Sequence, residues 1–273
     1  MTTPSQSPRT GQTQPVGATT PSATLSVAQL WRYPVKSMQG ERLSEAWLGP
    51  DGVAGDRLVH VQGNGGLLTG RTRGRLLRLR ATTGADGRPL VEGDDWQSEA
   101  VAVRVRAAAG PPARLVAYSG RERFDILPLL VATDGEIARF GYDERRLRPN
   151  LVIAGVAARE ERSWPGRAIR IGADVMIGVY ALRSRCVVTT FDPDSGAQDL
   201  DVLRHIRQQF AGQLALDCWV IRGGRVRPGD NVAVTDLPAT IDGVPVDETM
   251  PTPGGWVTGA PYAGVGANAH TED

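Results

Sequence analysis

The chain has 273 residues, and its 31 lysine and arginine side chains nearly balance 30 aspartate and glutamate side chains, which gives a formal net charge of +1. This balance argues against nonspecific binding to nucleic acid, which requires a clear basic excess. The sequence has no run of about 18 apolar residues, so we expect no membrane-spanning helix. Its two cysteines are too few for a disulfide framework or for a four-thiolate iron–sulfur cluster.

Residues 1–24 are rich in Thr, Ser, Pro and Gln, and we expect them to be disordered. The same segment lacks the apolar stretch of about 7–15 residues that a secretory signal requires. We therefore expect a cytoplasmic location and no contact with a membrane.

From residue 24 to about residue 118 the pattern is mostly that of β-strands. Apolar or alternating runs of strand length are separated by glycine-rich breaks, and they read TLSVAQLWRY, RLVHV, LLRLRA and VAVRVR. In the last of these runs Val101, Val103 and Val105 would share one face of a strand. Several short strands separated by turns predict a small barrel or sandwich.

The second half of the chain also has the pattern of strands, with two helices between them. Thr133 and Glu136 have the spacing of a capping box, which predicts a short helix from about Asp134. A second helix is expected over about 199–210, because its apolar residues share one face. The expected strands follow Pro149 and then read RAIRIGADVMIGVYAL, RCVVTT, CWVI and NVAV.

These patterns predict a mainly β protein, rich in β-barrel structure, with a few short helices. We divide it into a disordered segment 1–24, a β-barrel-like domain 25–120, a second β-barrel domain 121–235 and a flexible C-terminal tail 236–273.

Lys36 is the only lysine in the chain, against thirty arginines. It lies in the stretch WRYPVKSMQG, between a proline turn and a serine. The preference for arginine is most simply a compositional bias of the genome, so Lys36 is either a chance survivor or a residue with a particular role.

The two cysteines have different neighbours. Cys186 is flanked by Arg183 and Arg185, and nearby cations favour the thiolate, the form that acts as nucleophile or metal ligand. A small buried hydrophobic residue is the alternative interpretation of Cys186. Cys218, in LALDCWVI, has no cation within two positions and is interpreted as a core residue.

Other common site patterns are absent from the sequence. The three histidines have no short-spaced partner that would form a zinc site, and the chain has neither a P-loop nor a Gly-x-Gly-x-x-Gly turn after a strand. Cations do recur beside predicted strand ends, in Lys36-Ser37, Gly55-Asp56-Arg57, Thr69-Gly70-Arg71, Arg148-Pro149-Asn150 and Ser184-Arg185. If they converge on one cavity, they suit a phosphorylated ligand.

Read in order, six segments resemble the MOSC-domain family with its N-terminal β-barrel domain, the family of the amidoxime-reducing components and of the C-terminal domain of molybdenum cofactor sulfurases. The segments are VAQLWRYPVKSMQGERLSEA, GDRLVHV with LLTGR, LPLLVATDGEIARFG, RLRPNLVIAG, SRCVVTTFDPDSG and GRVRPGDNVAV. They span roughly residues 26–235. The order of the segments and the pairing of YPVKS with SRCVVTTFDPDSG make this match more specific than any single motif.

The resemblance implies a molybdenum cofactor, a molybdenum ion held by molybdopterin, and assigns roles to nine residues. Cys186 would be the metal ligand and the catalytic residue. The cofactor would be bound by Lys36, Ser37, Arg57, Arg71, Arg148, Asn150, Ser184 and Arg185. Lysine presents a compact charge that fits a narrow phosphate pocket, which gives Lys36 a reason to differ from the thirty arginines.

The chain also departs from the reductases of that family. By our alignment, their polar Thr-Ser pair falls at Ile126 and Leu127, and their tyrosine near the last strands falls near Asp217. Cofactor binding is thus better supported than the identity of the substrate.

The leading functional hypothesis is a molybdenum-dependent oxidoreductase that reduces small N-hydroxylated compounds. Its electrons would come from a separate donor protein of the reductase, ferredoxin or cytochrome type. The alternative is a sulfur carrier in cofactor maturation, with a Cys186 persulfide supplied by a pyridoxal-phosphate-dependent cysteine desulfurase. Two weaker alternatives are a Lys36 Schiff base with pyridoxal phosphate and a noncatalytic binding module whose cations lie on scattered faces.

Overall fold

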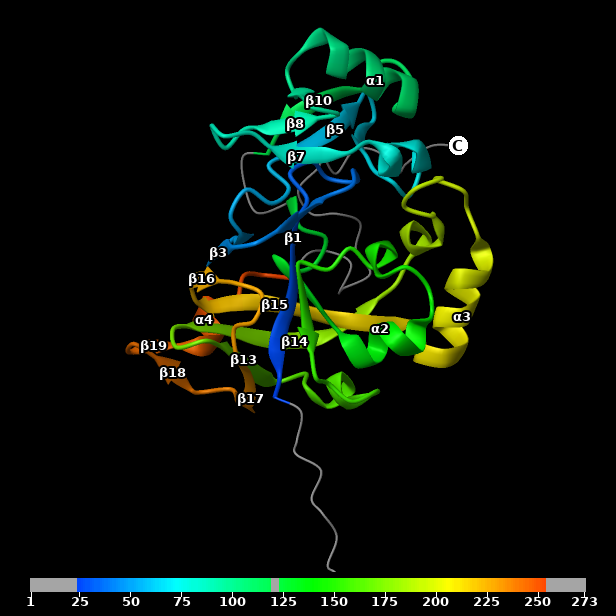
Figure 1. Ribbon diagram of the computed structural model, residues 1–273. Coiled ribbons are helices and arrows are strands. Elements are labelled where there is room, and N and C mark those ends of the chain that lie inside the picture. Colours follow the sequence, from blue (N-terminus) through cyan, green and yellow to red (C-terminus); the bar gives the residue numbers. More distant parts are fainter. Residues whose placement is uncertain (1–23, 119–122, 254–273) are drawn as a thin grey trace, which may run out of the picture.

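The computed structural model describes residues 24–118 and 123–253. The described chain forms two parts (Figure 1), a lower part that holds a large sheet and most of the helices, and an upper part with small sheets and a helix. The mainly β fold class predicted from the sequence is confirmed. Within the described residues, no helix is long and apolar enough to cross a membrane.

The large sheet of the lower part has eight strands in the order β17-β13-β14-β15-β11-β12-β1-β2. Their bounds are β1 (Ser26–Arg32), β2 (Glu41–Leu43), β11 (Leu129–Thr133), β12 (Leu151–Ala154), β13 (Arg167–Ile171), β14 (Val175–Ser184), β15 (Gln213–Arg222) and β17 (Val232–Asp236). Only the pair β11–β12 is parallel. Because β1 pairs with β12, with Leu30 opposite Leu151, the N-terminal segment completes the sheet of the C-terminal half.

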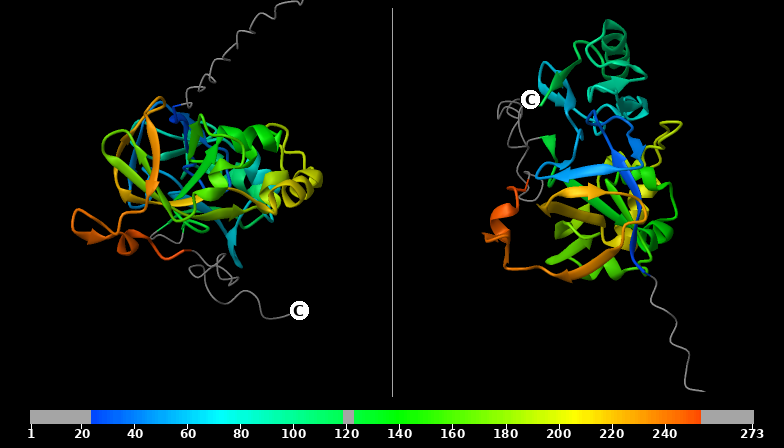
Figure 2. Two further views of the ribbon diagram at one scale, coloured as in Figure 1. Left: turned by 90° about the horizontal axis from the view of Figure 1, so that it is seen from below. Right: turned by 60° about the vertical axis from the view of Figure 1, so that its left-hand side comes forward.

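The sheet curls until its ends approach each other. The Val27 N–H donates to the Asp230 carbonyl at 2.9 Å and the Val232 N–H donates to the Leu25 carbonyl at 2.8 Å, which brings β1 beside the start of β17. Figure 2 shows this curl from below. Alternate side chains of each curled strand therefore point into one interior.

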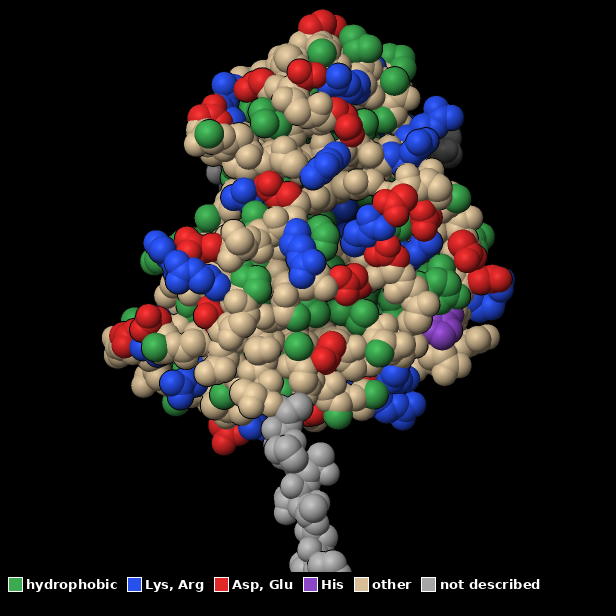
Figure 3. Space-filling view, viewed as in Figure 1, with side chains coloured by type: hydrophobic (Ala, Val, Ile, Leu, Met, Phe, Trp, Pro, Cys, Tyr) green, Lys and Arg blue, Asp and Glu red, His purple; other side chains and the backbone are tan. Residues whose placement is uncertain are grey.

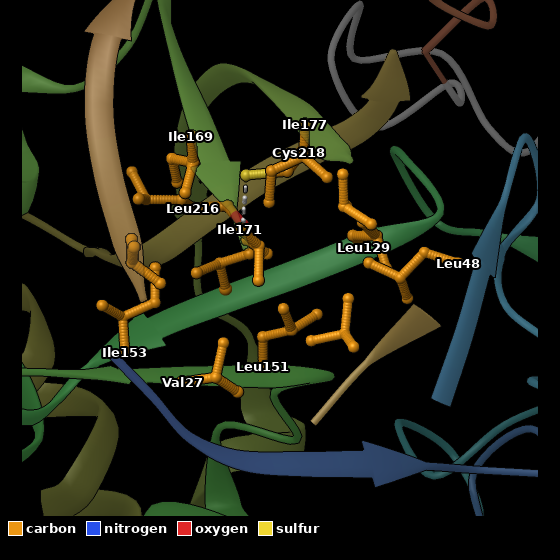
Figure 4. Close-up of a cluster of buried hydrophobic side chains, with 14 of the residues drawn as sticks. Val27, Leu48, Leu129, Leu151, Ile153, Ile169, Ile171, Ile177, Leu216 and Cys218 are labelled. Atoms are coloured by element: carbon orange, nitrogen blue, oxygen red, sulfur yellow. Dashed lines mark hydrogen bonds between the residues drawn. The ribbon is translucent and has the colours of Figure 1, made fainter. Parts of the chain in front are cut away.

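The interior of the curl is the largest apolar core of the molecule. Figure 4 shows side chains from β1, β11, β12, β13, β14 and β15 meeting there, among them Ile153, Ile169 and Ile171. Each fully buried side chain of this size contributes about 1.5–3 kcal/mol. Cys218 belongs to this core, has no exposed surface and donates a weak hydrogen bond to the Leu216 carbonyl at 3.8 Å. Burial raises the pKa of its thiol, so the interpretation of Cys218 as a core residue is confirmed.

The upper part contains two three-stranded sheets and a helix over a second core. The sheets are β10 (Arg114–Ala117), β5 (Val59–Gly63) and β6 (Gly66–Leu68), and β7 (Ala81–Thr83), β8 (Pro89–Val91) and β9 (Asp94–Asp95). The 3₁₀ turn η1 (Gly74–Arg78) and the helix α1 (Glu99–Ala109) cover them. A further sheet, β16 (Gly224–Val226), β3 (Ala46–Gly49) and β4 (Gly52–Val53), joins residues from both halves of the sequence.

The strand predicted over VAVRVR is wrong, because these residues lie in the middle of α1. Ser98 caps the helix, its Oγ accepting a hydrogen bond from the Val101 N–H at 3.3 Å. Val101 and Val105 are fully buried, whereas Val103 is 53% exposed. The buried face therefore repeats every four residues, as in a helix, and the alanines that flank the valines favour helix. The strand predicted over LLRLRA is likewise replaced by η1, and only its last residue, Ala81, begins β7.

Both predicted helices of the second half are confirmed, as α2 (Asp134–Phe140) and α3 (Leu200–Phe210). The Thr133 Oγ1 accepts from the Glu136 N–H at 3.4 Å, as the capping-box spacing predicted. Two 3₁₀ turns, η3 (Glu144–Arg146) and η4 (Glu160–Ser163), follow α2. The strand predicted over RCVVTT is wrong, because β14 ends at Ser184 and the 3₁₀ turn η5 (Val187–Thr190) follows.

The first part of the expected C-terminal tail is folded. It forms β18 (Thr240–Ile241), β19 (Val244–Pro245) and α4 (Val246–Thr249). Val246 is buried, and the Trp219 Nε1 donates to the Thr249 Oγ1 at 3.0 Å, so one apolar contact and one indole partner tie this segment to β15. The predictions for residues 1–23 and for the end of the tail, 254–273, lie outside the described residues.

Candidate functional site: a cationic cavity with one cysteine

All nine residues singled out from the sequence line one cavity, which we call the Cys186 cavity. It is lined by Lys36, Ser37, Arg57, Thr69, Arg71, Leu77, Phe124, Asp125, Leu127, Leu130, Leu147, Arg148, Asn150, Arg183, Ser184, Arg185, Cys186, Val188 and Asp217. The nine residues come from the end of β14 and from the connections that follow β1, β4, β6, η3 and β14, so the fold gathers positions up to 150 apart in the sequence. The cations thus lie around one site rather than on scattered faces.

Three of the nine residues have left-handed backbone conformations. The φ angles are 68° at Ser37, 50° at Arg57 and 58° at Arg148. Residues other than glycine adopt such angles at a cost of about 1–3 kcal/mol, and such residues cluster at functional sites. All three strained residues line the Cys186 cavity.

A buried network around Asp56 fixes Arg57 and Asn150. Asp56 accepts hydrogen bonds from the Tyr33 N–H at 2.7 Å, from the Asn150 Nδ2 at 3.3 Å and from the Arg57 guanidinium. The Asn150 Oδ1 accepts from the Leu130 N–H at 3.1 Å. Asn150 therefore connects β11 to the turn after β4, and its amide is already engaged inside the protein.

Arg148 lies over the ring of Tyr33, with its guanidinium carbon 4.3 Å from the ring centre. Burial lowers the pKa of Arg148 to about 10 and raises that of Tyr33. The described part of the chain offers Arg148 no ion pair. A half-buried cation held by a ring alone is a position that an anion would stabilise.

Asp125 lies between the cations at the Lys36 end of the cavity. Its carboxylate is 2.7 Å from the Lys36 Nζ, 3.0 Å from the Arg71 Nη2 and 3.4 Å from the Arg183 Nη2. These cations hold the pKa of Asp125 well below its usual range, whereas burial lowers the pKa of Lys36 to about 8. Sequence reasoning missed Asp125, although one acid inside the apolar run FDILPLL was a usable signal.

Asp217 on β15 is a second carboxylate that sequence reasoning did not assign to the site. It is buried, and it accepts from the Arg183 Nη1 at 2.6 Å. Burial raises its pKa. Next to this pair, Leu127 presents an apolar side chain to the cavity.

Cys186 is half-buried and lies where β14 has ended and η5 begins. The adjacent Arg185 is anchored by a hydrogen bond from its Nη2 to the Leu147 carbonyl at 2.7 Å, and its buried Nε has no hydrogen-bond partner. Burial, together with the nearby charge of Arg183, lowers the pKa of Arg185 to about 10. A cationic group beside the cysteine favours its thiolate.

The described residues that line the cavity include six cationic side chains and only two carboxylates. Together with the unpartnered Nε of Arg185, this excess positive charge fits an anionic group with oxygen acceptors. No group of three or more His, Cys, Asp or Glu side chains within the described residues could hold a metal ion. A metal here would take one protein ligand, Cys186, and its other ligands from a non-protein group.

Comparison with models of known protein families identifies the family of this chain. The model of the MOSC domain matches residues 129–233, and that of the MOSC N-terminal beta barrel domain matches residues 24–124. The chain belongs to the MOSC-domain family with a MOSC N-terminal β-barrel domain.

Named relatives are amidoxime-reducing components. The chain is 26% identical over 247 residues to mitochondrial amidoxime-reducing component 1 of Homo sapiens, covering 67% of this chain and 72% of the relative. It is 27% identical over 245 residues to mitochondrial amidoxime reducing component 2 of Macaca fascicularis, with the same coverage. Among solved structures, the YUAD protein from Bacillus subtilis aligns with a TM-score of 0.41 at 12% identity, covering 78% of this chain and 97% of that one.

Proposed function

We propose that this protein binds a molybdenum cofactor in the Cys186 cavity and reduces small N-hydroxylated compounds. One observation carries the proposal: the only lysine and the one partly exposed cysteine of the described chain line the same cavity, with five arginines around them. Membership of the MOSC family and the likeness to amidoxime-reducing components support the same assignment.

The cations of the cavity would hold the phosphate and the pterin. Lys36 and Arg71 lie together, since both contact Asp125, and with Ser37 they would bind the phosphate. Arg57 and Arg148 would contact the pterin from positions fixed by Asp56 and Tyr33. Ser184 and Arg185 would lie beside the cofactor near Cys186.

The Cys186 thiolate would be the protein ligand of molybdenum, in keeping with the affinity of soft metals for thiolates. When bound, the metal–dithiolene unit supplies oxygen-atom exchange coupled to two-electron transfer. The net reaction takes R–NHOH, two protons and two electrons to R–NH₂ and water. The electrons would come from a separate redox protein.

The apolar side chain of Leu127 supports a proposal about which substrates are preferred. It lines the cavity where the reductases of the family carry a hydroxyl, by the alignment above. A hydroxyl at this wall would bind a polar part of a substrate, whereas leucine excludes water and favours an apolar substituent. We therefore propose that the preferred N-hydroxylated substrates carry a hydrophobic group.

The sulfur-carrier hypothesis places a different chemistry at the same cysteine. In it a cysteine desulfurase would transfer sulfur to Cys186 and form a persulfide. Incubation with a desulfurase and cysteine, followed by mass spectrometry of the intact protein, separates the two functions. A mass gain of one sulfur that disappears in Cys186→Ala would favour the carrier, whereas an unchanged mass would favour the reductase.

The main test is metal analysis of the full chain produced in a host that makes the cofactor. We expect about one molybdenum and one molybdopterin per chain, both reduced about tenfold in Lys36→Ala. Protein that carries neither molybdenum nor molybdopterin would refute the proposal.

A further inference from the structure

A second cavity shares Arg148, Leu77 and Val188 with the Cys186 cavity, and the function proposed above gives no role to the rest of its lining. We call it the Arg42 cavity. It has a volume of about 370 Å³ and is lined by Trp31, Tyr33, Gln39, Gly40, Glu41, Arg42, Leu77, Arg80, Arg145, Arg146, Arg148, Val188, Phe191, Pro193 and Asp194. This volume is in the range of small-molecule sites. Figure 3 shows basic and acidic side chains gathered on the face that contains it, at the level where the two parts of the molecule meet.

The lining has more positive charge than its own acids neutralise. Five arginines face two carboxylates, and both carboxylates are already paired, Glu41 with Arg32 at 2.8 Å and Asp194 with Arg145 at 2.6 Å. Within residues 24–118 and 123–253, Arg42, Arg80 and Arg148 form no ion pair.

Arg146 gives more direct evidence that the Arg42 cavity binds a ligand. The side chain of Arg146 is 9% exposed, and Asp192 pairs with one end of its guanidinium at 3.0 Å. Its Nε is buried and has no hydrogen-bond partner. A buried donor without a partner costs about 1–3 kcal/mol, which an acceptor oxygen in the cavity would recover.

Aromatic rings also line this cavity. Trp31 on β1 and Phe191 after η5 are both half-buried and line the cavity, and Arg42 on β2 is the register partner of Trp31. Rings and guanidinium groups that line one space bind a planar base by stacking and a phosphate by paired hydrogen bonds. From the unpaired arginines, the buried Nε of Arg146 and these rings, we infer that the Arg42 cavity binds a nucleoside monophosphate or a phosphate ester of similar aromatic character.

The test is calorimetric titration of the full chain with adenosine 5′-monophosphate, inorganic phosphate and adenosine as separate ligands. We expect the nucleotide to bind about tenfold or more tightly than either fragment, since it engages both the rings and the arginines. In Arg42→Ala and in Arg80→Ala the nucleotide should bind about tenfold more weakly, because each change removes one charge-assisted contact. Both side chains are exposed, so the melting temperature should not change.

Two further variants test whether the nucleotide binds in the Arg42 cavity or in the Cys186 cavity. Arg170 is an exposed arginine of β13 that lines neither cavity, so Arg170→Ala should bind the nucleotide like the wild type. Lys36→Ala removes a cation of the Cys186 cavity and should also bind it like the wild type, within about twofold. Nucleotide binding no tighter than that of inorganic phosphate would overturn the inference. So would binding that falls in Lys36→Ala and persists in the Arg42 and Arg80 variants. Metal content is not part of this test, so its result is separate from that of the proposed function.

Discussion

The Cys186 cavity and the Arg42 cavity share Arg148, Leu77 and Val188, yet they differ in most other features. In the Cys186 cavity Asp125 and Asp217 lie among the cations, and the backbone is strained at three residues. In the Arg42 cavity three arginines of the described chain have no carboxylate partner, and the lining contains no cysteine. The Cys186 cavity is also smaller, with a volume of about 100 Å³ against about 370 Å³ for the Arg42 cavity.

This difference teaches that positive charge and reactivity are separate properties of a site. Both cavities can attract an anion, because cations exceed carboxylates in each. Only the Cys186 cavity combines that charge with a thiol, and there Asp125 pairs with Lys36, Arg71 and Arg183 before a ligand binds. We therefore assign redox chemistry to the Cys186 cavity and reversible binding to the Arg42 cavity.

The largest expected effect is that of Cys186→Ala. Removal of the metal ligand should lower reduction of an N-hydroxylated compound by at least about 100-fold, with a reduced viologen dye as the electron source. The side chain is half-buried, so the free energy of unfolding should change by less than about 1 kcal/mol.

Cys218→Ala is the matched control for that change. Cys218 is fully buried in the core, so its truncation should cost about 1–2 kcal/mol in the free energy of unfolding and leave activity unchanged. If Cys218→Ala abolished activity and Cys186→Ala did not, the assignment of chemistry to the Cys186 cavity would be reversed.

Lys36→Ala should have the next largest effect. It removes the buried cation expected to bind the cofactor phosphate, and we expect molybdopterin occupancy to fall about tenfold. Lys36→Arg keeps the charge but places a larger group in the narrow cavity, and should give an intermediate occupancy. Molybdopterin is measured by fluorescence after oxidative release from the purified protein. Equal molybdopterin occupancy in the wild type and both variants would show that Lys36 does not contribute to cofactor binding.

Asp125→Asn should strengthen anion binding. The Asp125 carboxylate contacts Lys36 and Arg71 where a ligand anion would contact them, so the two compete. Loss of its charge should tighten sulfate binding about fivefold, measured in the Arg42→Ala, Arg80→Ala background so that only the Cys186 cavity is tested. Weaker binding in Asp125→Asn would mean instead that Asp125 is needed to keep Lys36 charged.

The two cavities also differ in how many of their lining residues could be predicted from the sequence. The residues of the Cys186 cavity could be named because they lie in motifs whose order resembles a family, although no local pattern showed that they converge. Arg42 and Arg80 are ordinary arginines among thirty, and only the pairing of β1 with β2 and the position of η1 bring them together.

Local misassignments have a similar cause. The valines of α1 alternate in sequence like a strand, whereas the flanking alanines and the burial of Val101 and Val105 against the upper core favour the helix. Asp125 and Asp217 escaped notice because an acid in an apolar run acquires meaning only from the cations that the fold places beside it. The mainly β class needed less information, since many short apolar runs and turns already predict it.

The smallest expected effect is a difference in pH dependence between the cavities. Burial lowers the pKa of Lys36 to about 8, so its positive charge is present below that pH and is lost as the pH rises through it. Sulfate stays a dianion throughout this range, so its affinity for the Cys186 cavity should fall about fourfold between pH 7 and pH 8.5, in step with the protonated fraction of Lys36.

Lys36→Ala should abolish this dependence, which is the control. Nucleotide binding in the Arg42 cavity should not change between pH 7 and pH 8.5, because arginines supply its charge and even the buried Arg148 has a pKa of about 10. Parallel pH profiles for the two ligands would contradict the division of the shared positive charge into two separate sites. A decline confined to sulfate, and absent from Lys36→Ala, would attribute it to one ammonium group 2.7 Å from Asp125.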